Sequence, residues 1–228
     1  MSPPSRFGLL LSGGLDSSIL LAHLLSQGHA VHPFYIRGGL VWEAAELAAA
    51  ERFLAAIETS DGAHQLAPLV CLDLPVRDLY GDHWSTTGRD VPDEQSPDEA
   101  VFLPGRNPIL LVKAAVWCQL HGIAQLALAP LASNPFGDAS DEFFDTFERA
   151  LTLAMSRPLQ VVRPFLHLSK TQVMRLGASL PLELTFSCIA PQGGEHCGAC
   201  NKCAERQAAF RDAQFPDPTR YHGARLNG

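Results

Sequence analysis

The chain has 228 residues, of which 46% are hydrophobic and 18% charged, so its composition is that of a folded globular protein rather than a disordered one. Its formal net charge of −7, without a dense cluster of Lys and Arg, makes nucleic acid an unlikely main partner. No apolar run reaches the roughly 18–20 residues that span a bilayer, and the N-terminus lacks a signal-peptide layout. We therefore expect a cytoplasmic protein with no membrane partner.

Strand-like and helix-like segments alternate through most of the chain. In chain order we expect a strand at 6–11, a helix at 16–27, a strand at 30–36, a helix at 42–59, a strand at 66–74, a helix at 109–121, a strand at 124–129, a helix at 140–155, a strand at 159–162 and a helix at 169–176. This alternation predicts an α/β fold with a doubly wound, mainly parallel sheet. Residues 1–180 should form this domain, with residues 181–228 as a small appendage packed on it.

Residues 77–103 interrupt the alternation with a long polar stretch rich in Asp, Gly and Pro. A segment of that length without elements of its own, inside a compact domain, is usually a lid or a binding loop. A disordered surface insertion is the alternative interpretation.

The most specific local motif is Ser-Gly-Gly-Leu-Asp-Ser-Ser at residues 12–18, between the first predicted strand and the first predicted helix. Ligands of doubly wound sheets bind beyond the carboxyl ends of the strands. Two glycines let the backbone turn tightly beside an anion, and the helix N-terminus offers it unpaired N–H groups. The motif therefore predicts a phosphate-binding loop, while a plain strand–turn–helix corner would use the same glycines.

Asp16 is an acidic residue inside this predicted phosphate site. A carboxylate beside phosphate is unfavourable unless a cation joins the two, and Mg²⁺ prefers carboxylates together with phosphate oxygens. Asp16 is therefore a candidate Mg²⁺ ligand, and the alternative is that it only caps the helix.

Four of the six cysteines, Cys188, Cys197, Cys200 and Cys203, lie within 16 residues. Two Cys-x2-Cys spacings let thiolates converge on one tetrahedral ion, and four sulfurs leave no position open for water. The cluster therefore predicts a structural Zn²⁺ site in the C-terminal appendage. An iron–sulfur cluster, a redox pair at Cys200 and Cys203, and a ligand role for His196 in place of one cysteine are the alternatives.

Three further positions are candidates for anion binding. Arg106 and Asn107 precede the helix expected at 109–121, where the arginine could hold a phosphate or carboxylate with two hydrogen bonds. Asn107 could instead cap that helix. Lys170 follows Ser169, the expected helix cap, at a helix N-terminus where a cation is unfavourable without an anionic ligand. A solvated surface lysine is the alternative for Lys170.

The Ser-Gly-Gly-x-Asp-Ser loop resembles the PP-loop of the ATP pyrophosphatases. Together with Pro-Gly-Arg-Asn at 104–107 and the four-cysteine motif at 188–203, it resembles the 7-cyano-7-deazaguanine synthase family. Thr-Phe-Ser-Cys at 185–188 and the tail through Pro-Asp-Pro-Thr at 216–219 are similar too, so the resemblance spans nearly the whole chain.

The resemblance implies that ATP activates a carboxylate, that ammonia then gives an amide, and that a second ATP converts the amide to a nitrile. It implies ATP, Mg²⁺ and Zn²⁺ as cofactors, with 7-carboxy-7-deazaguanine and ammonia as substrates in queuosine and deazapurine biosynthesis. The residues assigned to catalysis are Asp16, Ser17, Arg106 and Lys170. Those expected at the ATP site are Leu11, Ser12, Gly13, Gly14, Leu15, Asp16, Ser17, Ser18, Tyr35 and Asn107.

Two segments depart from the family pattern. Members show Tyr-Gly-Gln after the second strand, where this chain has Tyr-Ile-Arg-Gly-Gly at 35–39, and Asp-Tyr-Ser-Gly-Tyr-Pro-Asp where residues 130–138 stand. A divergent ligase that forms an amide or conjugate from another carboxylate is therefore the alternative function. Sulfur transfer to RNA and a non-catalytic nucleotide-binding module are further alternatives, and a homodimer is plausible.

Overall fold

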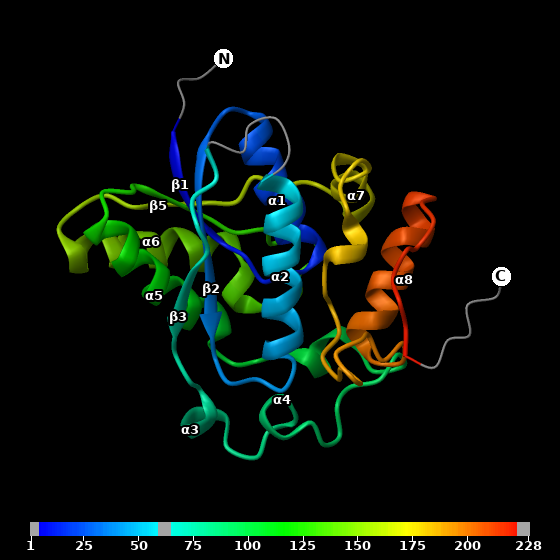
Figure 1. The fold of residues 1–228 in the computed structure, drawn as a ribbon. Coiled ribbons are helices and arrows are strands. Elements are labelled where there is room, and N and C mark those ends of the chain that lie inside the picture. Colours follow the sequence, from blue (N-terminus) through cyan, green and yellow to red (C-terminus); the bar gives the residue numbers. More distant parts are fainter. Residues whose placement is uncertain (1–4, 59–64, 223–228) are drawn as a thin grey trace.

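The computed structural model describes residues 5–58 and 65–222 of the chain (Figure 1). Its centre is one parallel sheet with the strand order β3-β2-β1-β4-β5. The strands are β1 (Arg6–Leu10), β2 (Ala30–Arg37), β3 (Val70–Asp73), β4 (Gln125–Ala127) and β5 (Gln160–Val162). This order, with β1 in the middle, confirms the doubly wound α/β fold expected from the alternating pattern.

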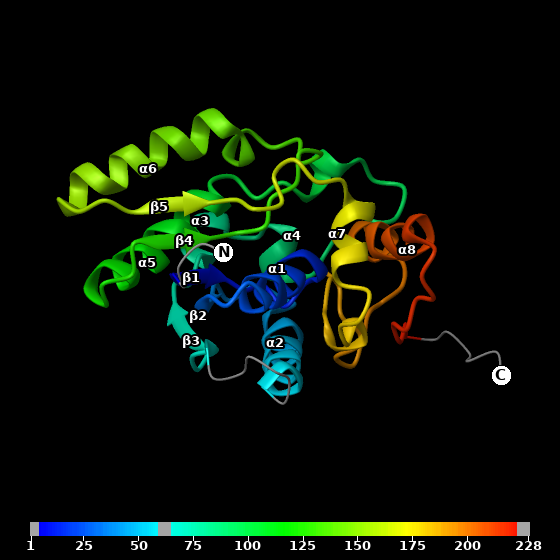
Figure 2. The same ribbon diagram turned by 90° about the horizontal axis from the view of Figure 1, so that it is seen from above.

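Helices cover both faces of the sheet (Figure 2). The longer helices are α1 (Leu15–Ser26), α2 (Glu43–Glu58), α5 (Arg106–Leu120), α6 (Asp141–Met155), α7 (Lys170–Leu176) and α8 (Asn201–Ala213). One buried cluster joins β1 to α1, α2, α7 and α8, and a second joins β2 and β4 to α5 and α6. The apolar faces of the sheet and of the helices are thus buried against each other on both sides.

The sheet and α5 approach each other closely at Gly8 on β1. A Cβ built at Gly8 would lie 2.5 Å from the Cys118 sulfur and 2.7 Å from the Phe34 ring. Any larger residue would push α5 off the sheet, because the interior is packed without spare volume. Cys118 is fully buried here, and burial raises the pKa of its thiol to about 12, so it acts as a small apolar side chain.

Two expectations from the sequence are corrected. Residues 77–103 are not structureless, since they form α3 (Arg77–Tyr80), α4 (Trp84–Thr87) and the 3-10 turn η2 (Asp98–Val101). The strand expected at 66–74 is paired regularly only over Val70–Asp73. The last residue of the helix expected at 42–59 lies outside the described residues.

The C-terminal region contains a helix, α8, that the sequence did not predict. It packs on α7, and two further 3-10 turns are η3 (Gly137–Ala139) and η4 (Leu182–Leu184). The division at residue 180 remains a prediction. None of the described helices is both long and apolar enough to cross a membrane.

Candidate active site and metal centre

A cleft of about 320 Å³ opens beyond the carboxyl ends of β1 and β4. The strand order reverses between these two strands, which is where doubly wound sheets bind their ligands. Several regions of the chain meet there: the glycine loop, the first turns of α2, α5 and α7, residues from 84–103, the segment 128–134, and the cysteine segment with α8.

The glycine loop is shaped by its backbone. Gly13 has φ of +76°, and a Cβ there would lie 2.8 Å from the Glu46 carbonyl oxygen, so only glycine fits against α2. Gly14 is the N-cap residue of α1 and offers no side chain to cap it, so the α1 N-terminus faces the cleft with its positive dipole end. The Ser12 and Ser17 hydroxyl oxygens lie 3.0 Å apart, and the Gly14 N–H donates to Ser12 Oγ at 3.3 Å.

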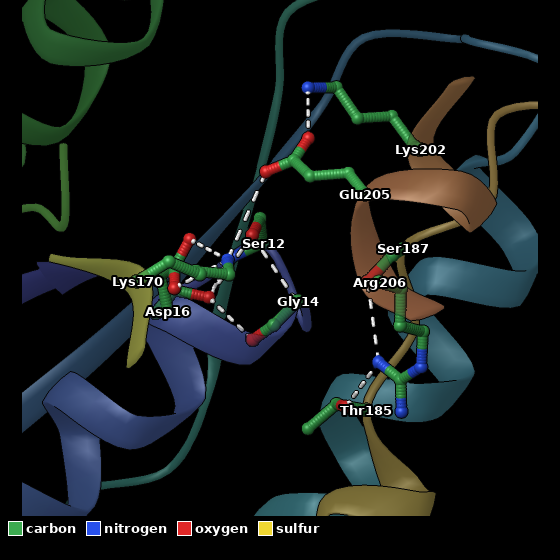
Figure 3. A network of polar contacts seen from close by, with 10 residues as sticks. Ser12, Gly14, Asp16, Lys170, Thr185, Ser187, Lys202, Glu205 and Arg206 are labelled. Atoms are coloured by element: carbon green, nitrogen blue, oxygen red, sulfur yellow. Dashed lines mark hydrogen bonds and ion pairs between the residues drawn. The ribbon is translucent and has the colours of Figure 1, made fainter. Parts of the chain in front are cut away.

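A row of alternating charges lies beside this loop (Figure 3). Lys170 Nζ donates to both carboxylate oxygens of Asp16 at 2.8 Å, and it lies 3.9 Å from Glu205. Glu205 in turn accepts from Lys202 at 2.6 Å. Desolvation opposes ionisation of Glu205, but Lys202 and Lys170 outweigh it and hold the pKa of this carboxyl below its usual value.

Lys170 is thus brought to Asp16 from a position 154 residues away. The helix that carries it begins with the capping box predicted in part from Ser169: Ser169 Oγ accepts from the Gln172 N–H, and Gln172 Oε1 accepts from the Ser169 N–H. The lysine therefore pairs with an acidic partner inside the cleft, and the solvated surface position considered for it does not describe the structure.

Arg106 and Asn107 begin α5 at the cleft, but their surroundings differ. Asn107 does not cap the helix, since Gly105 holds the N-cap position. Its side-chain amide donates to the Asp138 carbonyl oxygen at 2.9 Å, and its N–H donates to the Asp138 carboxylate at 3.1 Å. Asn107 thereby holds Asp138 at the end of the segment 130–138, while Arg106 lines the cleft.

The far end of the cleft is aromatic and apolar, with one carboxyl group. The Trp42 and Trp84 rings stack with their centroids 5.7 Å apart, and Glu46 lies beside them. Glu46 accepts a 2.7 Å hydrogen bond from the Tyr35 hydroxyl. Burial raises the pKa of Glu46 to about 7, against the opposing effects of the Arg106 guanidinium and the Tyr35 hydrogen bond. Burial likewise raises the pKa of the Tyr35 hydroxyl.

Most residues assigned from the sequence line this cleft. They are Ser12, Gly14, Leu15, Asp16, Ser17, Arg106, Asn107 and Lys170. The other four lie behind it: Leu11 and Ser18 are buried in the core, Gly13 shapes the loop, and Tyr35 supports Glu46. Ser18 is fully buried on the inner face of α1, and its hydroxyl has no hydrogen-bond partner within the described chain, so it does not reach the cleft.

Sequence reasoning missed several residues that line the cleft. Glu46, Trp84, Lys202, Glu205 and Arg206 all contribute to its walls. The signal that could have found the last three is their position within three residues of Cys203, since a metal site that fixes two cysteines also fixes their neighbours. Glu46 and Trp84 carry no comparable signal.

Arg206 ties the cysteine segment to the rest of the protein. It is only 1% exposed, and its guanidinium donates to the Thr185 hydroxyl at 2.8 Å, the Leu182 carbonyl oxygen at 2.8 Å and the Thr219 hydroxyl at 2.6 Å. A third side chain, Ser187, accepts at 3.3 Å (Figure 3). Neutral oxygen acceptors thus pair with several N–H donors of the Arg206 guanidinium. An arginine can be buried only when its donors are paired in this way.

The four cysteines converge as the spacing predicts. Their sulfur atoms all lie within 4.8 Å of one another, with 3.8 Å between Cys188 and Cys200 and 3.9 Å between Cys197 and Cys203. Four ligands at zinc–sulfur distances of about 2.3 Å around a tetrahedral ion would stand about 3.8 Å apart. The Ala190 and Cys197 N–H groups each donate to Cys188 Sγ at 3.3 Å, which favours a thiolate. The cluster can therefore hold a metal ion.

His196 is not part of this cluster. Its Nε2 accepts from the Ser187 N–H at 3.1 Å, and its ring lies 4.4 Å from that of Phe186. Burial, assisted by the Arg206 charge, lowers the pKa of His196 to about 4, so the ring is a neutral acceptor. This structural use leaves the four thiols as the ligand set, and the alternative in which His196 replaces a cysteine does not fit.

A central parallel sheet with a Ser-Gly-Gly-Leu-Asp-Ser loop after its middle strand defines a protein of the PP-loop ATP pyrophosphatase type. The chain belongs to the family described as queuosine biosynthesis protein QueC, whose model matches residues 8–214.

Relatives of similar length support this assignment. The chain is 33% identical over 234 residues to the 7-cyano-7-deazaguanine synthase of Anaeromyxobacter sp. (strain Fw109-5), covering 96% of this chain and 97% of the relative. It is 35% identical over 224 residues to the enzyme of that name from Xanthomonas campestris pv. campestris (strain B100), covering 93% and 96%. The structure of a 4-thiouridine synthetase–RNA complex with bound ATP matches with a TM-score of 0.53 at 16% identity, covering 92% of this chain and 50% of that one, and shows the fold alone.

Proposed function

We propose that the chain is a 7-cyano-7-deazaguanine synthase, which converts 7-carboxy-7-deazaguanine and ammonia to the nitrile in two successive ATP-dependent activations. Family membership and the names of relatives that match it along their full length support the proposal. The observation that carries it is the meeting of a glycine loop, an Asp16–Lys170 pair and Arg106 in one cleft at the strand-order reversal.

In the first activation, a substrate carboxylate oxygen attacks the α-phosphorus of ATP, and pyrophosphate leaves. Ser12 and Ser17 are placed to hold phosphate oxygens, together with the N-terminus of α1 that follows Gly14. Asp16 would hold Mg²⁺, which supplies charge neutralisation at the phosphates. Lys170 brings a positive charge to this part of the cleft beside Asp16, and Arg106 brings another near Glu46. Such fixed charges act more strongly in a cleft than in water.

In the following steps ammonia attacks the acyl carbon, AMP leaves, and the amide forms. The amide oxygen then attacks the α-phosphorus of a second ATP and displaces pyrophosphate. Loss of AMP and protons from the adenylated amide gives the nitrile. One set of phosphate-binding groups serves both activations, because each places an oxygen at the same phosphorus. The work of the chain is therefore mainly to position the reactants and stabilise charge.

We propose that zinc is the metal of the cysteine cluster. The sulfur–sulfur distances fit its tetrahedral radius, and four thiolates complete its shell, so its role is structural. Free thiols at this density suit a reducing compartment, which supports a cytoplasmic enzyme. A homodimer is proposed only from the prevalence of two-fold assemblies.

Purified protein incubated with ATP, Mg²⁺, ammonium and 7-carboxy-7-deazaguanine should give the nitrile and AMP, both measured by mass spectrometry. The segments that depart from the family pattern are tested at the same time, because Pro130 and Asn134 of the segment 130–138 line the cleft. Folded, metal-loaded protein that binds ATP but forms no nitrile would contradict the proposal. A screen of other carboxylic acids with ammonia or amines for AMP release would then test the alternative ligase function.

A further inference from the structure

The cleft has a polar end and an aromatic end. The polar end holds the glycine loop, Asp16 and Lys170. The aromatic end is defined by Trp42, Trp84, Val101, Leu103 and Phe186. Four of these side chains belong to one buried cluster, and Trp84 is partly buried and packs against it. Walls of this kind suit a flat heterocycle, because aromatic rings stack favourably on planar surfaces.

Glu46 is the acidic side chain at this aromatic end. Its Oε2 accepts from the Tyr35 hydroxyl at 2.7 Å, and within residues 5–58 and 65–222 nothing donates to its Oε1. The second oxygen is not among the buried polar atoms that lack partners, so it is accessible, and Glu46 lines both the cleft and a smaller neighbouring pocket that contains Tyr35. The backbone around Glu46 is fixed, because its carbonyl oxygen packs against Gly13. The carboxyl is thus held in place with acceptor capacity left over.

We propose that Glu46 selects the substrate by accepting hydrogen bonds from the N1–H and the 2-amino group of a guanine-like base. This inference rests on the proposed function. A carboxylate is an acceptor only, and a guanine-like edge presents two adjacent donors to it. Adenine presents one amino group beside a ring acceptor, so the same carboxylate would match it less well.

The surroundings of Glu46 should make the protein discriminate strongly between bases with and without the two donors. Burial disfavours the charged form of the group, which has one protein hydrogen-bond donor, Tyr35, and the Arg106 charge in its favour. Two donors of the base would supply what is missing. A base without the 2-amino group would leave the carboxylate underpaired, and sites built around a substrate donor reject analogues that lack it.

The test combines a substrate change with a protein change. For the wild type, replacing 7-carboxy-7-deazaguanine by the analogue without the 2-amino group should lower kcat/KM about 10- to 100-fold. In Glu46→Gln the same substrate change should have little effect, because the loss has already occurred. The variant should fold, since the glutamine amide oxygen can accept the Tyr35 hydrogen bond in place of the carboxylate. Glu51→Gln, an exposed position on the same helix, is the matched control and should behave as the wild type.

Tyr35→Phe removes the donor that orients Glu46 and is the second variant. It should raise KM for the deazaguanine acid while KM for ATP stays unchanged. Undiminished discrimination in Glu46→Gln would overturn the proposal. So would a selective rise in KM for ATP, which would place adenine at the aromatic end, or a change confined to KM for ammonium, which would make Glu46 a proton acceptor.

The proposed function can fail separately. If the wild type forms no nitrile, that function is wrong, and the inference is then decided by calorimetric binding of the two bases to the ATP-loaded protein. Equal affinity of the wild type for both bases would overturn it. A preference for the 2-amino base that disappears in Glu46→Gln would support it.

Discussion

The two sides of the cleft are held in place by different means. The glycine loop at 12–18 is a continuous stretch between β1 and α1, and the conformation of Gly13 and the packing of α2 fix it. On the other side, residues 185–200 contain no helix or sheet strand, and four thiols together with the Arg206 hydrogen bonds organise them. The first side depends on backbone geometry, and the second depends on four thiols that can hold a metal ion and on one buried arginine.

The difference implies that the two sides can be disrupted separately. Two contacts connect them. Lys170, on the helix α7 that packs on α8, contacts Asp16 and Glu205, and the Phe186 N–H donates to the Gly13 carbonyl oxygen at 2.8 Å. Damage to the cysteine side should therefore reach the phosphate side through α7 and α8. Damage to the glycine loop should leave metal binding intact.

The largest expected effect comes from removing the metal. Cys200→Ser should lower the melting temperature by about 10 °C or more and reduce solubility, because a structural metal contributes several kcal/mol to folding. Metal content and melting with and without chelator measure it. Cys71→Ser, at an exposed cysteine on β3 outside the cluster, is the control and should match the wild type. Unchanged melting in metal-free protein would show that the thiols do not organise this side.

The second largest effect concerns the charge between the two sides. Asp16→Asn should reduce kcat/KM about 10²- to 10³-fold, which corresponds to roughly 3–4 kcal/mol of lost charge stabilisation. The fold and the bound metal should persist, because the Asp16 carboxylate pairs with Lys170 at the cleft surface rather than within the core. Asp78→Asn, at an exposed position of α3, is the control. Full activity of Asp16→Asn would remove Asp16 from the proposed Mg²⁺ site.

Two glycines with similar backbone angles provide a test of the loop itself. Gly13 (φ +76°) and Gly28 (φ +83°) both require a left-handed conformation, but of these two only at Gly13 would a Cβ meet backbone, at 2.8 Å. Gly28→Ala should lower stability by about 1 kcal/mol, and Gly13→Ala by about 1–2 kcal/mol more, with a raised KM for ATP. Denaturant unfolding and ATP kinetics measure these effects. Equal losses in both variants would mean that close packing on α2 does not shape the loop.

The sequence predicted the glycine side better than the cysteine side, for physical reasons. The alternation of apolar strands and helices indicates a parallel sheet, and the Gly-Gly pair marks the loop. The convergence of four thiols also followed from spacing alone. Helix α8 was not predicted for two reasons. Its N-cap residue is Cys200, which is not a residue type that caps helices well, and polar residues in its first turns hide the apolar periodicity.

The aromatic end could not be predicted, because it is assembled over long sequence separations. Trp42, Trp84 and Phe186 come from three separate segments, and helix α4, which carries Trp84, is only 4 residues long. So short a helix shows no 3.6-residue periodicity to detect. Glu46 in turn looks like one of several acidic residues on a solvated helix until Tyr35 and the cleft are placed beside it.

The smallest expected effect is the pH dependence that Glu46 adds to stability. Its folded-state pKa of about 7 lies above the ordinary value of 4.5, so the folded protein holds this proton more tightly than the unfolded chain does. Stability from this group is full below about pH 4.5 and is lost as the pH rises through 7. Because Glu46 is only partly buried, we expect about 1 kcal/mol of this effect to remain. Glutamine cannot ionise, so the melting temperature of Glu46→Gln relative to the wild type should rise by about 2–4 °C between pH 5 and pH 8. Glu51→Gln should show no such trend, and a difference independent of pH for Glu46→Gln would mean that Glu46 is solvated like a surface carboxylate.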